Sequence, residues 1–112
     1  MNLSKPVVFL GSALEDLKEF PVTVRREAGY QIDRVQHGFE PDDWKPMPAI
    51  GMGVREIRMR DSEGIFRIMY VATLRDAVYV LHCFQKKTNK TGRLDLALAE
   101  KRYRDLMKER ER

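Results

Sequence analysis

Basic side chains on three neighbouring segments are the residues of this sequence whose types and spacing could do chemistry. Arg58 lies in an alternating segment, Arg67 lies inside an apolar segment, and Lys86 and Lys87 end a third. Four more basic residues surround them: Arg55, Arg60, Lys90 and Arg93. Guanidinium and ammonium groups bind phosphate and stabilise negative charge that develops on it. The cluster therefore indicates phosphate chemistry, with these four as RNA-binding residues.

RNA can be cut without a metal ion when its own 2′-hydroxyl attacks the neighbouring phosphorus. The reaction needs a proton acceptor, cations beside the phosphorus and an acid for the leaving oxygen. Arg58 and Arg67 could supply the cations. Lys86 or Lys87 could move protons, because crowding by other cations lowers the pKa of a lysine. His82 is the only nearby residue whose ordinary pKa suits neutral pH.

Each of these residues also has a purely structural interpretation. Arg58 could pair with Glu56, His82 could be a hydrogen-bonded core residue, and the two lysines could form a solvated strand end. Arg67 is harder to explain in this way, because an arginine inside an apolar strand must be paired or must face a groove.

Several kinds of site are excluded by the residue inventory. The two histidines, His37 and His82, lack metal-ligand spacing, and the single Cys83 allows neither a disulfide nor a cysteine zinc site. Phosphate-binding glycine loops and nucleophile elbows are also missing from the sequence. We expect no cofactor and no metal.

Composition favours one soluble domain over residues 1–112. The chain is 43% hydrophobic, enough for an ordinary core, and contains no apolar run near the roughly 20 residues that span a membrane. The N-terminus is a poor secretion signal, so we expect a cytoplasmic protein without membrane contact. The net charge is +4 and the basic excess lies after residue 84, which favours a polyanionic partner.

The stretch from Val54 to Thr88 predicts a three-stranded antiparallel meander that carries the basic residues. Its first segment alternates Ile57 and Met59 with polar residues, and the others run from Ile65 to Ala72 and from Ala77 to Phe84. The third is almost wholly apolar, as expected of a strand covered on both faces, yet it contains His82. The sequence DSEG at 61–64 is typical of a hairpin turn.

The remaining segments predict a strand and three helices around this meander. Val7–Leu10 should be a strand at a sheet edge, followed by a short helix with a capping box of Ser12 and Glu15. A second helix should begin near Pro21 and end near Gly38, and a last helix should begin near Arg93. The stretch 39–53 holds three prolines and two glycines and is predicted to be a loop. The fold class is therefore α+β.

Three motifs resemble one family of small proteins. They are G-x-G-V-R-E-I-R at 51–58, G-I-F-R-I-M-Y at 64–70 and L-H-C-F-Q-K-K-T-N-K-T at 81–91. With the predicted order of elements, they are similar to the phage Gp49-like, HigB-type branch of the RelE/ParE toxin superfamily. The resemblance spans nearly the whole chain and implies a small RelE-like fold.

The resemblance implies the toxin of a type II toxin–antitoxin module, an endoribonuclease that cuts mRNA at the ribosomal A site without metal. A cognate antitoxin would neutralise it, the partners would be mRNA and the ribosome with its 16S rRNA, and operator DNA would be bound only through the antitoxin. By position, Arg58, Arg67, Lys86 and Lys87 match the basic residues of the family's strands, and His82 matches the histidine of this branch. The same fold also serves ParE-like toxins that inhibit DNA gyrase without cutting RNA, and a catalytically inactive RNA-binding module is a third interpretation.

Overall fold

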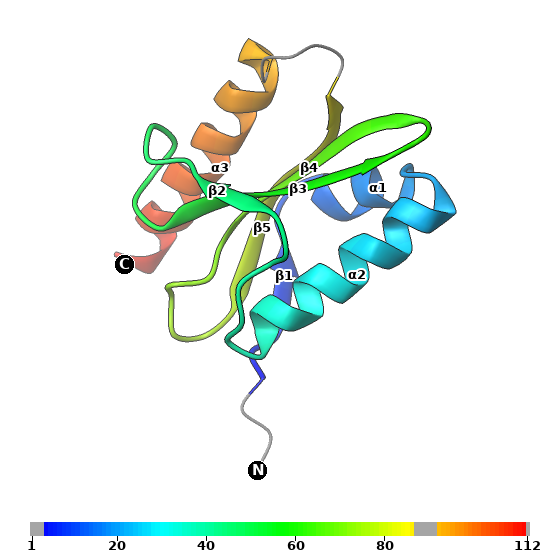
Figure 1. Ribbon diagram of the computed structural model, residues 1–112. Helices are drawn as coiled ribbons and strands as arrows, with labels where there is room; N and C mark the ends of the chain where they lie inside the picture. Colours follow the sequence, from blue (N-terminus) through cyan, green and yellow to red (C-terminus); the bar gives the residue numbers. More distant parts are fainter. Residues whose placement is uncertain (1–3, 87–91, 112) are drawn as a thin grey trace.

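The computed structural model describes residues 4–86 and 92–111. Along the chain the elements are β1 (Val7–Phe9), α1 (Ala13–Lys18), α2 (Val22–Gln36), β2 (Trp44–Pro46), β3 (Val54–Asp61), β4 (Gly64–Val71), β5 (Val78–Lys86) and α3 (Arg93–Arg110). The strands form one sheet in the order β1-β5-β4-β3-β2 (Figure 1). The pair β1–β5 is parallel and the other three pairs are antiparallel. This mixed arrangement confirms the α+β fold with an N-terminal strand and a C-terminal helix.

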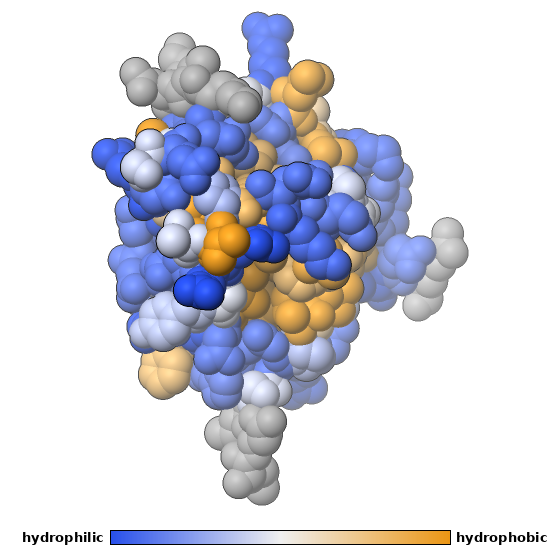
Figure 2. Space-filling model, turned by 90° about the vertical axis from the view of Figure 1, so that its right-hand side faces the viewer, coloured by the Kyte–Doolittle hydropathy of each residue, from blue (hydrophilic) through white to orange (hydrophobic). Residues whose placement is uncertain are grey.

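The sheet separates two apolar cores. The helices α1 and α2 pack on one face and α3 packs on the other (Figure 1). The first core includes Val24, Ile57 and Ile68, and the second includes Val54, Leu81 and Leu106. Helices that are polar on their outer side cover both cores. Figure 2 shows one flank of the molecule, which is largely hydrophilic around an apolar area.

The alternation along the central strands decides which side chains reach which core. In β4, Phe66, Ile68 and Tyr70 lie in the core beneath α1 and α2. Met69 and Val71 lie in the core beneath α3, and Arg67 shares their face because side chains alternate along a strand. An irregularity in the β4–β5 register at Met69 and Tyr70 inserts one residue into β5, so the alternation of β5 shifts there.

The structure confirms most predicted elements and corrects two. The meander, the buried face of α2 and the start of the last helix at Arg93 are as predicted. The stretch 39–53 is not only a loop, because Trp44–Pro46 form the edge strand β2 beside β3. Pro46 is tolerated there because an edge strand has one side without ladder bonds. The capping box is also wrong, since Ser12 Oγ donates to Asp16 Oδ2 at 2.9 Å and makes no bond to the helix backbone.

Two general features of the described residues bear on function. None of the helices in residues 4–86 and 92–111 combines the length and the apolar character that a membrane crossing requires. In the same part of the chain, no three His, Cys, Asp or Glu side chains are arranged to hold a metal ion.

Candidate active site

The strand pairing gathers basic side chains on the α3 face of the sheet, next to the area that α3 covers. We call this set the cationic face, and its members are Lys45, Arg58, Arg60, Arg67 and Lys86. Arg58 and Arg67 are direct partners on β3 and β4, and the register pairs Ile65 with both Arg60 and Lys86. Antiparallel partners of this kind hold their Cβ atoms about 5 Å apart. The two strand arginines that the sequence singles out are therefore neighbours in space.

Glu56 lies in the middle of the cationic face and is fully buried. Its Oε1 atom is 3.2 Å from Arg67 Nε and 3.9 Å from Lys45 Nζ. Lys45 is also its direct cross-strand partner. Neither carboxylate oxygen has a hydrogen-bond partner among the described residues, so the contact with Arg67 is an ion pair rather than an aligned hydrogen bond. Glu56 thus compensates part of the positive charge without cancelling it, since it faces five cations.

Arg67 is the most buried cation of the site, with a relative exposure of 5%. Burial lowers its pKa, Glu56 opposes that effect, and the neighbouring Arg58 lowers the pKa further. A guanidinium stays protonated under such conditions because its ordinary pKa is above 12. Arg67 is therefore a fixed positive charge in a poorly solvated place, where an anion interacts with it more strongly than in water.

Lys86 at the end of β5 is half-buried and has a lowered pKa. Desolvation is the largest cause, and the charge of Arg67 is the second. A lysine with a lowered pKa gives up its proton more readily than a solvated lysine, which suits a group that transfers protons.

His82 is buried and is held by the first turn of α3. Its Nε2 atom lies 2.7 Å from Asp95 Oδ1, and its ring stacks on Phe84 with centroids 5.0 Å apart. The other ring nitrogen, Nδ1, is buried and has no hydrogen-bond partner among the described residues. The geometry supports a positioning role for His82, since its ring is fixed against Phe84 within β5 and its Nε2 joins β5 to Asp95 of α3.

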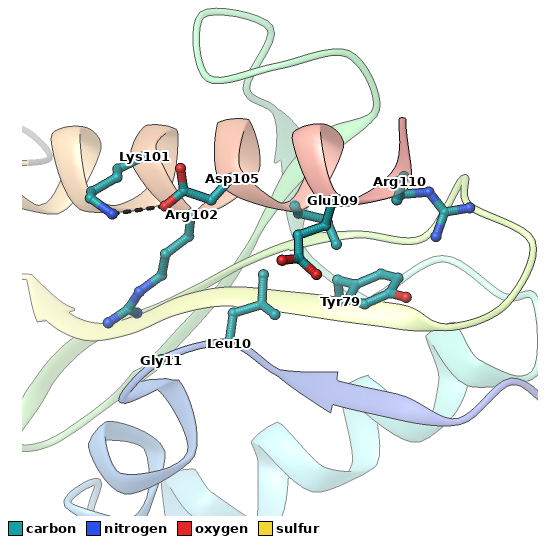
Figure 3. A pocket seen from close by; sticks show the side chains of 9 residues that line it. Leu10, Gly11, Tyr79, Lys101, Arg102, Asp105, Glu109 and Arg110 are labelled. Atoms are coloured by element: carbon teal, nitrogen blue, oxygen red, sulfur yellow. Dashed lines mark hydrogen bonds and ion pairs between the residues drawn. The ribbon is translucent and has the colours of Figure 1, made fainter. Parts of the chain in front are cut away.

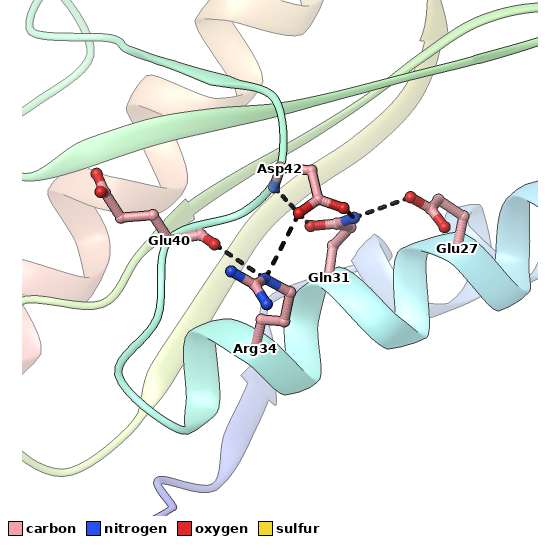
Figure 4. Close-up of polar contacts among 5 residues, drawn as sticks. All are labelled: Glu27, Gln31, Arg34, Glu40 and Asp42. Carbon is pink, nitrogen blue, oxygen red and sulfur yellow. Dashed lines mark hydrogen bonds and ion pairs between the residues drawn. The ribbon is translucent and has the colours of Figure 1, made fainter.

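A polar network on the far side of β3 supports Arg58. Gln31 of α2 donates to Glu27 and to Asp42 and accepts from the Asp42 backbone, at 2.8, 2.7 and 2.9 Å (Figure 4). It thereby fastens the segment that leads into β2. The next carbonyl, that of Asp43, accepts from the Arg58 backbone N–H at 2.9 Å. A substitution at the buried Gln31 would disturb the strand position of Arg58 through this chain of contacts.

The structure separates some predicted residues from this site. Arg55 lies on the opposite face of β3, where its guanidinium stacks 3.9 Å from the Trp44 ring centroid and approaches Glu40. Arg93 is exposed at the start of α3, two residues before Asp95. Arg60, in contrast, belongs to the cationic face and is exposed on it. The predicted residues Lys87 and Lys90 lie outside the described residues.

A groove along α3 is a different place from the cationic face. It has a volume of about 640 Å³ and runs along α3 over Leu10 and Tyr79 (Figure 3). Its basic residues are engaged. Lys101 pairs with Asp105 at 2.7 Å and Arg110 pairs with Asp76 at 2.9 Å. Arg102 donates to the Leu81 carbonyl at 2.8 Å and to Ser12 Oγ at 3.0 Å. This groove offers little uncompensated positive charge, so it is a poor candidate for binding phosphate.

Sequence reasoning missed three contributors to the site. Lys45 lies in a stretch whose prolines predict a loop, so no strand was expected there. Asp95 looks like an ordinary acidic residue in the first turn of a helix. Glu56 was considered only as a partner for Arg58. Period-two alternation places Glu56, Arg58 and Arg60 on one strand face, but it cannot say which cation of the next strand lies closest to the carboxylate.

Comparison with known proteins gives one result. The model of the family described as phage derived protein Gp49-like (DUF891) matches residues 15–104, which includes every described residue of the cationic face. The chain belongs to the Gp49-like family. The assignment confirms the resemblance inferred from the strand motifs. A search of curated proteins gave no significant match.

The family membership agrees with the geometry of the sheet. The Gp49-like match begins in α1 and ends within α3, so it covers α2 and β2–β5 completely and parts of α1 and α3. Membership in this family is consistent with the toxin of a toxin–antitoxin module and thereby with an antitoxin partner.

Proposed function

We propose that this Gp49-like protein is a toxin that cuts mRNA at the ribosomal A site and is neutralised by a cognate antitoxin. The observation that carries the proposal is the direct pairing of Arg58 with Arg67 beside Lys86, on a sheet face with five cations around one buried carboxylate. Two like charges side by side cost stability, which is reasonable where an anionic ligand is meant to bind between them.

The chemistry that fits this arrangement is attack by the RNA's own 2′-hydroxyl. The 2′-oxygen forms a bond to phosphorus, the bond from phosphorus to the 5′-oxygen of the next nucleotide breaks, and a 2′,3′-cyclic phosphate remains. Arg58 and Arg67 stabilise the extra negative charge on the phosphorane oxygens. Removing one preorganised donor of this kind typically lowers the rate by about 10²–10³-fold.

In this proposal, the two lysines Lys86 and Lys87 transfer the protons. Lys86 accepts the 2′-hydroxyl proton in its neutral form, whose population is raised by the lowered pKa. Lys87, the residue after Lys86 in the sequence, is the candidate that returns a proton to the leaving 5′-oxygen. His82 keeps the first turn of α3 in place beside them through Asp95.

The partners follow from the same proposal. The mRNA and the 16S rRNA of the ribosome are the polyanions that the cationic face would meet, with Arg60 and Arg93 as exposed contacts. The antitoxin would hide this face or displace α3, and operator DNA would be bound only by the toxin–antitoxin complex. A complex that leaves Arg58 and Arg60 as accessible to chemical modification as in the free toxin would show that the antitoxin does not cover the face.

The test is mRNA cleavage mapped to the nucleotide in a reconstituted translation reaction, with and without ribosomes. Arg58→Gln and Lys86→Gln each remove one charge from the cationic face, and Arg67→Lys keeps the charge but loses the forked geometry. Arg75→Gln is the matched control, because Arg75 is exposed in the turn between β4 and β5. We expect A-site cuts that Arg75→Gln leaves unchanged and that the three site variants reduce by about 10²-fold or more.

Two outcomes would overturn this proposal. If no cuts appear and the protein instead inhibits supercoiling by DNA gyrase, it is a ParE-like toxin. If RNA binds with steep salt dependence and no variant or condition gives cuts, the cationic face is a binding surface without catalysis.

A further inference from the structure

A second pocket lies on the other face of the sheet, beside the C-terminal end of α2. It has a volume of about 260 Å³, and its apolar wall includes Val35, Phe39 and Ala72. Arg55 and Tyr70 line it as well. Because Arg67 and Tyr70 lie on opposite faces of β4, this pocket is separate from the cationic face.

The hydroxyl of Tyr70 is a donor without an acceptor. Tyr70 is 2% exposed, and its hydroxyl has no hydrogen-bond partner among the described residues. Burial raises the pKa of this hydroxyl, so it stays protonated at neutral pH. A buried hydroxyl without a partner lowers the stability of a protein, and such a group calls for an explanation.

The neighbouring side chains cannot supply the missing acceptor. Arg55 is close enough to lower the pKa of Tyr70 by a side-chain hydrogen-bond contact and by its charge, but a guanidinium only donates, so the phenolic O–H still has no acceptor. Lys5 likewise only donates, and its ammonium group is used by the carbonyls of Ala72 and Leu74 at 2.6 and 2.8 Å. Tyr70 and Arg55 therefore present two donors to the same pocket.

The acidic residue at the rim, Glu40, pairs with Arg55 and does not accept from Tyr70. Glu40 Oε2 lies 3.6 Å from Arg55 Nη1, and its side chain is 64% exposed. Figure 4 shows this carboxylate pointing away from α2, while the Glu40 carbonyl accepts from Arg34 at 3.1 Å. Arg55 is held in place by this contact and by the ring of Trp44, so its position is prepared before any ligand arrives.

We propose that this pocket binds a carboxylate carried on an apolar body, with the carboxylate accepting from Tyr70 and Arg55 and the apolar body lying against Val35 and Ala72. The exposed ring of Phe39, which is 61% exposed beside the pocket, closes over the apolar part. The ligand is either a small free carboxylic acid or an acidic side chain of a partner protein. Inorganic phosphate does not fit, because nothing in it would contact the apolar wall.

Titration of the full chain with phenylacetate, followed by amide NMR of Gly53 and Ala72, tests this inference. We expect saturable shifts at both amides, with binding weakened about tenfold by Tyr70→Phe and by Arg55→Gln, as for the loss of one charge-assisted hydrogen bond. Tyr30→Phe is the matched control, because it removes a hydroxyl that is exposed on α2. Tyr70→Phe should also raise the melting temperature of the free protein by roughly 3–8 °C, since it removes the unpartnered group.

Further titrations distinguish the sources of the carboxylate. If the blocked peptide acetyl-Leu-Glu-Leu-amide shifts the same amides and binds more tightly than phenylacetate, the pocket accepts a partner's side chain; the reverse order assigns it to a small acid. Equal shifts with inorganic phosphate would overturn the inference. It would also be overturned if phenylacetate produced no saturable shift or bound Tyr70→Phe as tightly as the native chain. None of these readouts depends on RNA cleavage.

Discussion

The ion pair between Glu56 and Arg67 allows the sharpest test of how the cationic face is held together. In Glu56→Gln the shape of the side chain is kept and its charge is lost. Arg67 would then remain buried beside Arg58 without a compensating carboxylate. Breaking a buried pair by removing one partner is strongly destabilising, because the remaining charge is neither paired nor solvated.

The expected size follows from the geometry. At 3.2 Å and an effective dielectric constant of about 20, the attraction between the two charges is about 5 kcal/mol. Removing one member of a buried pair usually costs about 3–5 kcal/mol, and both side chains here are at most 6% exposed, so no large correction for solvent is needed. Lys45 adds less, because its side chain is 45% exposed. We expect Glu56→Gln to lower the free energy of unfolding by about 3–5 kcal/mol.

Urea unfolding monitored by far-UV circular dichroism measures this change, and the melting temperature should fall by roughly 10–20 °C. Glu100→Gln is the matched control, because Glu100 pairs with Arg104 on the exposed face of α3 at 3.6 Å. That variant should change stability by less than about 0.5 kcal/mol. The double variant Glu56→Gln with Arg67→Met should recover most of the loss, since it removes the stranded charge. If Glu56→Gln were as stable as Glu100→Gln, our account of the buried pair would be wrong.

Three further predictions concern the scaffold. Gly29→Ala should stabilise the protein by up to about 1 kcal/mol in urea unfolding, because Gly29 lies within α2 and a Cβ there would contact nothing within 4 Å; no gain would mean that α2 needs this glycine for another reason. Gly51→Ala should destabilise the protein, since its Cβ would lie 2.2 Å from the Tyr103 ring. In a Tyr103→Ala background, Gly51→Ala should cost no further stability; an equal loss in the native and the Tyr103→Ala backgrounds would contradict this. Burial raises the pKa of Cys83 to about 12, so its thiol should resist Ellman's reagent at pH 8 until urea unfolds the chain. Because the pKa of the Cys83 thiol in the folded chain lies above its ordinary value of 9.0, the contribution of Cys83 to stability is complete below pH 9 and is lost as the pH rises toward 12. Cys83→Ala should weaken that alkaline loss.

Much of this fold could be predicted because its patterns are local. Period-two alternation set Ile57 and Met59 apart from the polar residues of their strand, and both lie in the core beneath α1 and α2. Pro21 and Gly38 marked the ends of α2 to within two residues. The strand β2 could not be predicted in the same way, because three residues with a proline carry no periodic signal and are ordered by pairing with β3. The parallel pairing of β1 with β5 joins distant parts of the chain, which no local pattern reports.

The candidate site was predictable in its residue types and less so in its arrangement. Alternation placed Arg58 on the polar face of its strand and left Arg67 inside an apolar strand, but only the hairpin register makes them direct partners. The placement of Arg55 on the opposite face follows from the same alternation, since it is an odd number of residues from Arg58. The contact of His82 with Asp95 depends on how α3 packs against β5, which is a tertiary feature.

The central claim, that the cationic face promotes attack by the RNA's own 2′-hydroxyl, is tested most directly by changing one oxygen of the substrate. An mRNA is prepared with a single 2′-deoxynucleotide on the 5′ side of the mapped cleavage position. It is then translated in the reconstituted reaction in the presence of the native protein. Our account predicts that cutting at that position disappears, while the unmodified mRNA yields a 2′,3′-cyclic phosphate end. Undiminished cutting of the 2′-deoxy substrate would contradict it, because another nucleophile would then be attacking the phosphorus.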